Sequence, residues 1–272
     1  MSLTPQPLPA LGTDRILADV RDGIGWITFN QPQRRNAMSL DMWTGLGIAA
    51  EAFERDPAVR AVVMRGAGGK AFVSGADISE FEQHRADASQ KQAYDDIAAR
   101  GHAGLAALGK PLIAMIEGYC VGGGLAIALA ADVRFAASSA RFAIPAARLG
   151  LGYDYRGVAA LARLVGPSTA KDILFSARFL EADEALRVGL LNVVVDTAEL
   201  EAQVLHYAAR LAANAPLTLQ AAKAAVRLFE HATDMADTST VAALVAQCFD
   251  SHDYREGRRA FLAKRPPIFQ GR

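Results

Sequence analysis

Residues 112–136 read LIAMIEGYCVGGGLAIALAADVRFA, and this stretch decides the fold class. The uninterrupted apolar run at 112–116 is typical of a strand that is buried on both faces. A glycine-rich turn at 117–124 and an alanine-rich helix at 125–131 follow it, and a second apolar run at 133–136 predicts the next strand. Strands that alternate with helices over short connections favour an α/β fold.

The same kind of pattern extends toward the N-terminus. Residues 16–20 and 24–30 predict a hairpin, and the apolar run AVVMR at 61–65 predicts a further buried strand. Between them, Ser39 is suited to cap a helix over 40–54, because its side-chain oxygen can accept a hydrogen bond from the first helical turn.

The last third of the chain has a helical pattern. The predicted helices are residues 200–214, 216–230 and 238–250. We therefore divide the chain into a flexible N-terminal tail at 1–14, an α/β core at 15–199 and a C-terminal helical region at 200–272.

Composition excludes several functional classes. In 272 residues, 29 Lys and Arg balance 29 Asp and Glu, so the chain lacks the basic excess that binds nucleic acid or anionic membranes. With 51% hydrophobic and 21% charged residues, it has the composition of a globular protein. We expect neither a signal peptide nor a membrane-spanning segment. Cys120 and Cys248 lie far apart without metal-ligand spacing, so we expect no metal site, no disulfide framework and a cytoplasmic location.

Two glycine-containing turns carry the strongest chemical signal. Residues 73–77 (VSGAD) and 122–124 (GGG) each lie between a predicted strand and a predicted helix. Small residues let a ligand approach the main chain, and N–H groups at a helix start stabilise negative charge, so two such turns can form an oxyanion hole. The alternative is that both are tight packing turns. The sequence contains no motif for a P-loop, dinucleotide site, serine-hydrolase elbow, zinc protease or CxxC pair.

Three segments resemble the crotonase, or enoyl-CoA hydratase/isomerase, superfamily. They are NQPQRRNAM at 30–38, AFVSGADISEF at 71–81 and GYCVGGGLAIALAADVRFA at 118–136. The likeness extends from about residue 15 to the closing segment FDSHDYREGRRAFLAKRPPIF at 249–269. It implies a spiral of ββα units, a C-terminal helical region for trimerisation, and homotrimers or hexamers. It also implies an acyl-CoA thioester as the substrate, with no further cofactor.

The resemblance also implies roles for individual residues. The thioester oxygen would accept hydrogen bonds from the N–H groups of Ala76 and Gly123, whose dipoles would stabilise an enolate or a tetrahedral oxyanion. The residues implied for coenzyme A binding are Arg34, Arg35, Ala37, Ser74, Asp77, Ile78 and Lys264. For the three basic residues, ordinary solvated surface charge is the alternative.

The sequence departs from the hydratases at two positions. Hydratases of this family hold and activate water with two glutamates, and the corresponding residues here are Ala126 and Ala146. Alanine can neither transfer a proton nor orient water, and general acid–base help is worth about 10²–10⁴-fold in rate. The two alanines therefore argue against simple enoyl-CoA hydration.

A polar segment at 149–157 (LGLGYDYRG) is the candidate replacement. It resembles the 4-chlorobenzoyl-CoA dehalogenases of the superfamily, whose nucleophilic aspartate corresponds to Asp154. It also resembles methylmalonyl-CoA decarboxylase, whose active-site tyrosine corresponds to Tyr153 and whose histidine corresponds to Ala76. The two likenesses indicate the same place and different reactions. The alternative for Asp154 is a structural ion pair with Arg156.

His102 is a further candidate, because in this family the helix predicted at 92–108 crosses the acyl pocket, although a packed or solvated histidine is the alternative. Two hypotheses about function follow. In the first, the chain is an acyl-CoA enzyme whose reaction is hydration, isomerisation, decarboxylation or thioester hydrolysis. In the second, it is a paralogue that binds acyl-CoA or a protein partner without turnover.

Overall fold

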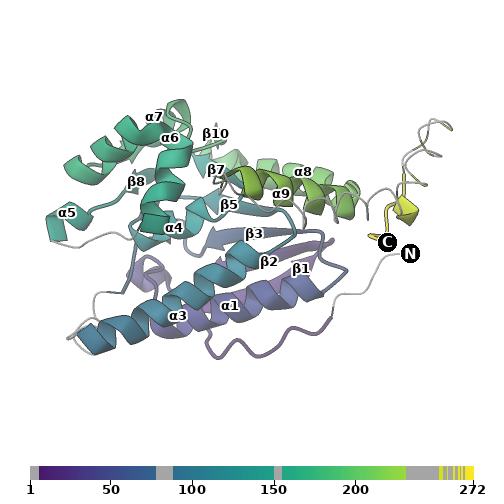
Figure 1. Ribbon diagram of the computed structural model, residues 1–272, viewed down its shortest axis with the longest axis horizontal. Helices are drawn as coiled ribbons and strands as arrows, with labels where there is room; N and C mark the ends of the chain where they lie inside the picture. Colours follow the sequence, from purple (N-terminus) through teal and green to yellow (C-terminus); the bar gives the residue numbers. More distant parts are fainter. Residues whose placement is uncertain are drawn as a thin grey trace.

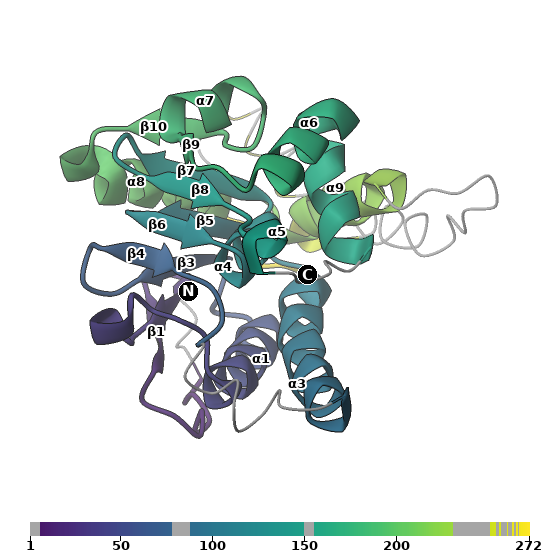
Figure 2. The same cartoon turned by 90° about the vertical axis from the view of Figure 1, so that its left-hand side faces the viewer.

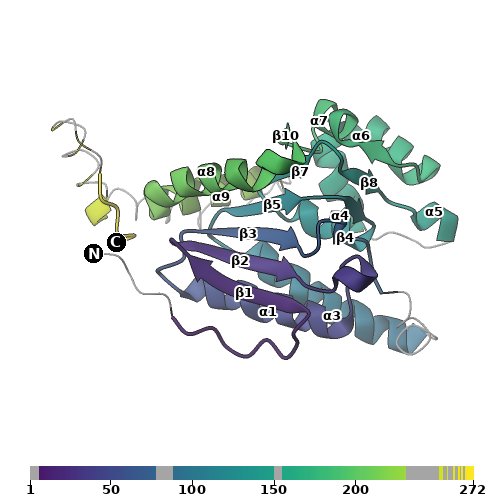
Figure 3. The ribbon, with the colours of Figure 1, turned by 180° about the vertical axis from the view of Figure 1, so that it is seen from behind.

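A six-stranded sheet forms the centre of the protein (Figures 1 and 3). The computed structural model describes residues 6–77, 88–149, 155–230, 251–253, 256, 260, 263, 265 and 267–272, without the side chains of 88–95, 148–149 and 155–156. The strands run in the order β1 (Ile16–Arg21), β2 (Ile24–Phe29), β3 (Ala61–Gly66), β5 (Leu112–Ile116), β7 (Val133–Ala137) and β10 (Val193–Val195). The hairpin β1–β2 is antiparallel, as predicted, and the other neighbouring pairs are parallel.

A second, smaller sheet lies beside the first (Figure 2). Its strands are β4 (Ala71–Val73), β6 (Tyr119–Val121), β8 (Arg141–Ala143) and β9 (Leu180–Glu181), in that order. Strands β4, β6 and β8 follow β3, β5 and β7 along the chain, so the chain passes from the large sheet to the small one at each turn of the fold. This arrangement confirms the predicted α/β spiral of ββα units. The trimerisation role of the C-terminal region stays a prediction.

The structure corrects the expectation for the glycine-rich turn. The sequence predicts a turn over 117–124 and a helix from residue 125, but residues 119–121 form strand β6 and helix α4 spans Gly123–Leu129. Strand β6 is only three residues long and exists because β4 and β8 pair with it on either side. Because glycines flank these residues on both sides, the sequence pattern does not predict a strand here. The strand is stabilised by pairing with strands that are distant in the sequence.

Helices cover both faces of the large sheet (Figure 1). Helices α1 (Leu40–Arg55) and α3 (Ala88–Ala107) pack together on one side, and the buried side chains of α1 share one hydrophobic cluster with Ile27, Val62 and Leu112. Helix α8 (Leu200–Ala213) covers the other side and packs on alternate residues of the same strands, such as Trp26 and Ile113. Burial of both faces explains the uninterrupted apolar runs in the strands.

The described residues also form four further helices and two 3-10 turns. They are the helices α5 (Ala146–Leu149), α6 (Tyr155–Ser176), α7 (Ala182–Arg187) and α9 (Pro216–Glu230), and the 3-10 turns η1 (Pro32–Arg34) and η3 (Thr197–Glu199). The helix predicted at 238–250 lies outside the described residues. In the described part of the chain, no helix has both the length and the apolar character needed to cross a bilayer.

The predicted segment boundaries stay predictions. Within the segment 6–14, the N–H of Gln6 donates to Asp56 Oδ2 at 2.8 Å, and Leu8 and Leu11 pack against the core. The flexible N-terminal tail at 1–14 stays a prediction. The division at residue 200 stays a prediction, although α8, which follows it, packs directly on the central sheet.

Candidate active site

Ala76 lies three residues after the end of β4, just beyond a bend at Gly75. Met38 forms an isolated parallel bridge with it: the N–H of Met38 donates to the Gly75 carbonyl at 2.8 Å, and the N–H of Asp77 donates to the Met38 carbonyl at 2.8 Å. In a parallel bridge these bonds go to the residues on either side of the opposed one. The peptide N–H of Ala76 itself therefore faces away from Met38.

Gly123 lies close to Ala76. It is the first residue of α4, directly after the N-cap Gly122, whose own N–H donates to the Ala143 carbonyl at 2.8 Å. N–H groups in the first turn of a helix have no acceptor within the helix. A Cβ atom placed on Gly123 would lie 3.9 Å from the Ala76 nitrogen, so the two main-chain donors are close neighbours.

The three glycines of this turn have different surroundings. A Cβ on Gly124 would lie 2.0 Å from the Val73 carbonyl oxygen, so close packing of α4 on β4 requires glycine there. A Cβ on Gly122 would meet no described atom within 4 Å, and the nearest atom to one on Gly123 is the Ala76 nitrogen. Gly124 is therefore a packing glycine, whereas among the described residues a Cβ on Gly122 would meet nothing within 4 Å and one on Gly123 would make only ordinary contacts.

This arrangement has a definite chemical capability. Main-chain donors at Ala76 and Gly123 that point at one oxygen atom would stabilise negative charge on it, and they are held by secondary structure before any ligand arrives. The N-terminal end of α4 adds the positive end of a helix dipole.

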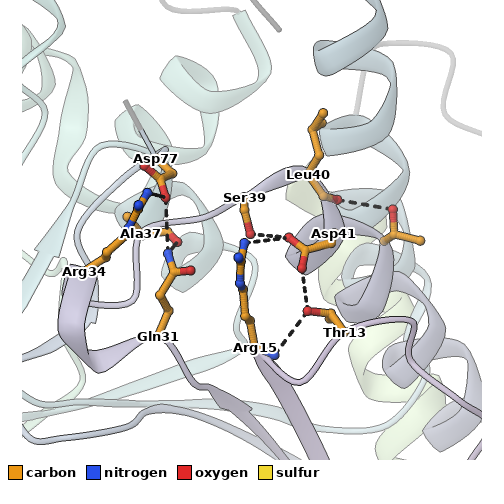
Figure 4. Close-up of polar contacts among 10 residues, drawn as sticks. Thr13, Arg15, Gln31, Arg34, Ala37, Ser39, Leu40, Asp41 and Asp77 are labelled. Carbon is orange, nitrogen blue, oxygen red and sulfur yellow. Dashed lines mark hydrogen bonds and ion pairs between the residues drawn. The ribbon is translucent and has the colours of Figure 1, made fainter. Parts of the chain in front are cut away.

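The residues predicted to bind coenzyme A lie partly around this point. The Asp77 carboxylate is buried, and its Oδ2 accepts a hydrogen bond from Arg34 Nη1 at 2.7 Å (Figure 4). Arg35 places its guanidinium 5.1 Å from the centre of the Tyr119 ring, and the Ser74 hydroxyl donates to the Arg34 carbonyl at 3.4 Å.

Ala37 is buried next to this group, whereas Ile78 and Lys264 lie outside the described residues. The structure thus brings Arg34 and Asp77 together and gives the Asp77 carboxylate partners within the protein. The binding roles of all these residues stay predictions.

The candidate acid–base positions are less completely placed. Ala126 stands three residues after Gly123 in α4, and Ala146 begins α5 three residues after β8. Tyr153 and Asp154 lie outside the described residues, as does the side chain of Arg156.

The His102 ring packs against the Trp43 ring between α3 and α1, with ring centres 4.7 Å apart and the two planes tilted by 41°. The aromatic contact is compatible with the packed alternative for this histidine, and its catalytic role stays a prediction.

Two ionisable groups at β6 have shifted pKa values. Complete burial raises the pKa of the Cys120 thiol, so the thiol stays protonated near neutral pH and is a poor nucleophile. Partial burial raises the pKa of Glu117, which precedes β6. Among the described residues, no group of three or more His, Cys, Asp or Glu side chains is arranged to hold a metal ion.

Sequence reasoning missed two buried amides beside the site. Gln31 and Asn36 are 2% and 0% exposed and lie in the loop that leads to Met38. Amide residues around a Pro-initiated turn are common in surface loops, so their sequence signal is weak.

Comparison with known proteins identifies the family of the chain. The family model for enoyl-CoA hydratase/isomerase matches residues 19–272. The chain is 32% identical over 252 residues to the short-chain-enoyl-CoA hydratase of Clostridium acetobutylicum, which covers 93% of this chain and 96% of that protein. It is 34% identical over 256 residues to the crotonyl-CoA hydratase of Syntrophomonas wolfei, with 94% and 98% covered. A crystal structure of an enoyl-CoA hydratase/carnithine racemase from Magnetospirillum magneticum superposes with a TM-score of 0.90 at 38% identity, covering 96% of this chain and 97% of that one.

Proposed function

The chain belongs to the enoyl-CoA hydratase/isomerase family, and from that premise we propose that it stabilises the oxyanion or enolate of an acyl-CoA thioester at the N–H groups of Ala76 and Gly123. One observation carries the proposal: a Cβ on Gly123 would lie 3.9 Å from the Ala76 nitrogen, so the two donors are neighbours, and among the described residues neither Gly122 nor Gly123 is packed as tightly as Gly124.

The reaction that follows is proposed to depend on a group other than a glutamate of α4 or α5. The named relatives are hydratases, which favours hydration, but Ala126 and Ala146 provide no acid or base. We assign the missing role to Asp154, assisted by Tyr153. An Asp154→Asn variant should keep its fold and its affinity for coenzyme A while losing turnover, because an amide can act neither as base nor as nucleophile. A stable, fully active variant would move attention to His102.

A chromophoric thioester tests the oxyanion hole whichever reaction the protein catalyses. In 4-(dimethylamino)cinnamoyl-CoA, hydrogen bonds to the thioester oxygen draw electrons from the amine and shift the absorption to longer wavelength. Bound to the parent protein, this probe should show a red shift that Gly123→Pro largely removes. An unshifted spectrum for the fully bound probe would disprove the hole.

Turnover of an acyl-CoA panel then separates the enzyme from a non-catalytic binder. The panel contains crotonyl-CoA, methylmalonyl-CoA and 4-chlorobenzoyl-CoA, and products are identified by mass spectrometry. The two alanines favour the alternative that the protein is an acyl-CoA-binding or interaction paralogue. A red-shifted probe with no product from any thioester would support that alternative.

The cellular setting is part of the proposal. We propose a cytoplasmic homotrimer or hexamer that takes the coenzyme A thioester as substrate and uses no further cofactor. Nucleic acid and membranes are not proposed partners, since the charges balance.

A further inference from the structure

Asn36 ties the loop before Met38 to the start of β4. The side chain is fully buried and the residue has a φ of +57°, a left-handed conformation that asparagine tolerates better than most residues. Its Oδ1 accepts the Gln31 N–H at 2.9 Å, and its Nδ2 donates to the carbonyls of Ala67 at 3.0 Å and Ala71 at 2.7 Å. One side chain therefore fixes both ends of the β3–β4 turn to the loop.

Gln31 spans the two strands of the Met38–Ala76 bridge. Its Nε2 donates to the Ala37 carbonyl at 3.0 Å and to Asp77 Oδ2 at 3.3 Å (Figure 4). Ala37 directly precedes Met38, and Asp77 directly follows Ala76. The amide thus holds the residue before one member of the bridge to the residue after the other.

We propose that Gln31 and Asn36 are positioning residues that set the direction of the Ala76 N–H. The donor belongs to a single peptide plane, and that plane is fixed by the bridge to Met38 and by the path of β4. Gln31 holds the bridge to Met38, and Asn36 holds the start of β4. Because catalytic donors must be held to within a fraction of an ångström, a small rotation of this plane weakens the hydrogen bond to a thioester oxygen. The inference rests on the oxyanion hole proposed above.

A second polar network near Met38 provides a matched control. Thr13 Oγ1 donates to Asp41 Oδ2 at 2.5 Å, Arg15 Nη1 donates to Asp41 Oδ1 at 3.4 Å, and the Ser39 hydroxyl also donates to Asp41 (Figure 4). These contacts hold the N-terminal segment to the start of α1. They bond to neither Ala37 nor Asp77, so their loss should affect stability without turning the Ala76 peptide.

The test compares Gln31→Met with Thr13→Val, using 4-(dimethylamino)cinnamoyl-CoA at saturation. Methionine is close to glutamine in shape and lacks both donors. For Gln31→Met we expect the red shift of the bound probe to fall by roughly half or more while its Kd changes by less than about threefold. For Thr13→Val we expect the parental red shift together with a lower Tm. A merely structural role for Gln31 would lower the Tm and leave the spectrum of the bound probe unchanged.

Two further variants keep the outcomes distinct. If Gln31→Met does not fold, Gln31→Asn is the test variant. Its shorter side chain withdraws the amide from Ala37 and Asp77 but stays polar. Its bound probe should show a smaller red shift than the parent complex, and a parental spectrum in a folded Gln31→Met or Gln31→Asn protein would overturn the inference. Gly123→Pro separates the two proposals. A parent without a red shift contradicts the hole itself, whereas a shift lost in Gly123→Pro and kept in the Gln31 variants contradicts only the positioning role.

Discussion

The two ends of the β4–β6 pair are both rich in glycine, for opposite reasons. Near the start of the strands, a Cβ on Gly66, the last residue of β3, would lie 2.1 Å from a main-chain carbonyl oxygen, and one on Gly118 would lie 2.2 Å from another. At the far end, Gly122 has no described atom within 4 Å of that position and Gly123 only main-chain atoms of residues 75 and 76, the nearest at 3.9 Å. The first end is a packed corner, and the second, which we call the open end, leaves room for an added Cβ among the described residues. Glycine alone therefore does not distinguish a packed corner from a candidate site; the contacts around each glycine do.

The packed end should be the more sensitive to an added methyl group. Gly118→Ala introduces a clash with the Lys70 carbonyl and a strained φ of +67°. Overpacking costs roughly 1–3 kcal/mol and the left-handed backbone about 1–2 kcal/mol more. We expect the Tm to fall by more than about 5 °C in thermal unfolding followed by circular dichroism. A Tm equal to the parent's would show that this corner is as open as the other end.

The open end should respond in activity rather than in stability. Gly123→Pro removes one donor at the first position of α4, where proline is tolerated in helices. We expect kcat on the substrate found in the thioester panel to fall by roughly 10²–10³-fold. Unfolding curves provide the control and should place the Tm near that of the parent. Unchanged kcat in the folded variant would remove this turn from the mechanism.

This contrast also shows what the sequence could and could not predict. The apolar runs of β3 and β5 predicted strands buried on both faces, because local composition records burial directly. Strand β6 could not be predicted in the same way, since its three residues depend on pairing with β4 and β8.

The residues of the candidate site also differ in how far the sequence could predict them. Ala76 and Gly123 came from a family resemblance, and only the packing around Gly124 separates the packed glycine from the open ones. Gln31 and Asn36 could not be found from sequence, because their partners are main-chain carbonyls and a carboxylate up to 46 residues away.

The open end has main-chain donors, but the two alanine positions near it provide no acid or base. Supplying carboxylates at these positions should therefore raise the activity of the open end. In the double variant Ala126→Glu/Ala146→Glu, hydration of crotonyl-CoA should rise by about tenfold or more over the parent, a part of what acid–base catalysis can contribute. Loss of absorbance of the conjugated thioester measures the rate. Each single variant is the control, because it supplies only one of the two carboxylates that hydratases of this family use. A parent that already hydrates crotonyl-CoA with a kcat of about 10–10³ s⁻¹ would contradict our interpretation of both alanines.

The smallest expected effect is a pH dependence at the packed end. Glu117 directly precedes Gly118, and a Cβ on Gly69 would lie 3.2 Å from its Oε1. Burial raises its pKa above the ordinary value of 4.5, so the folded protein disfavours the ionised carboxylate. At acidic pH both folded and unfolded chains carry the protonated acid, and no penalty arises. The penalty grows as pH rises through the folded pKa, because the unfolded chain ionises more easily.

Glu117→Gln removes the ionisation and keeps the shape of the side chain. We expect the variant to melt slightly above the parent at neutral pH and at the same temperature near about pH 4. Glu51→Gln on the exposed face of α1 is the matched control and should show no gain that appears only at neutral pH. If the gain for Glu117→Gln is equal at both pH values, it does not come from the carboxylate charge. The close packing at this end would then impose no measurable cost on a neighbouring charge.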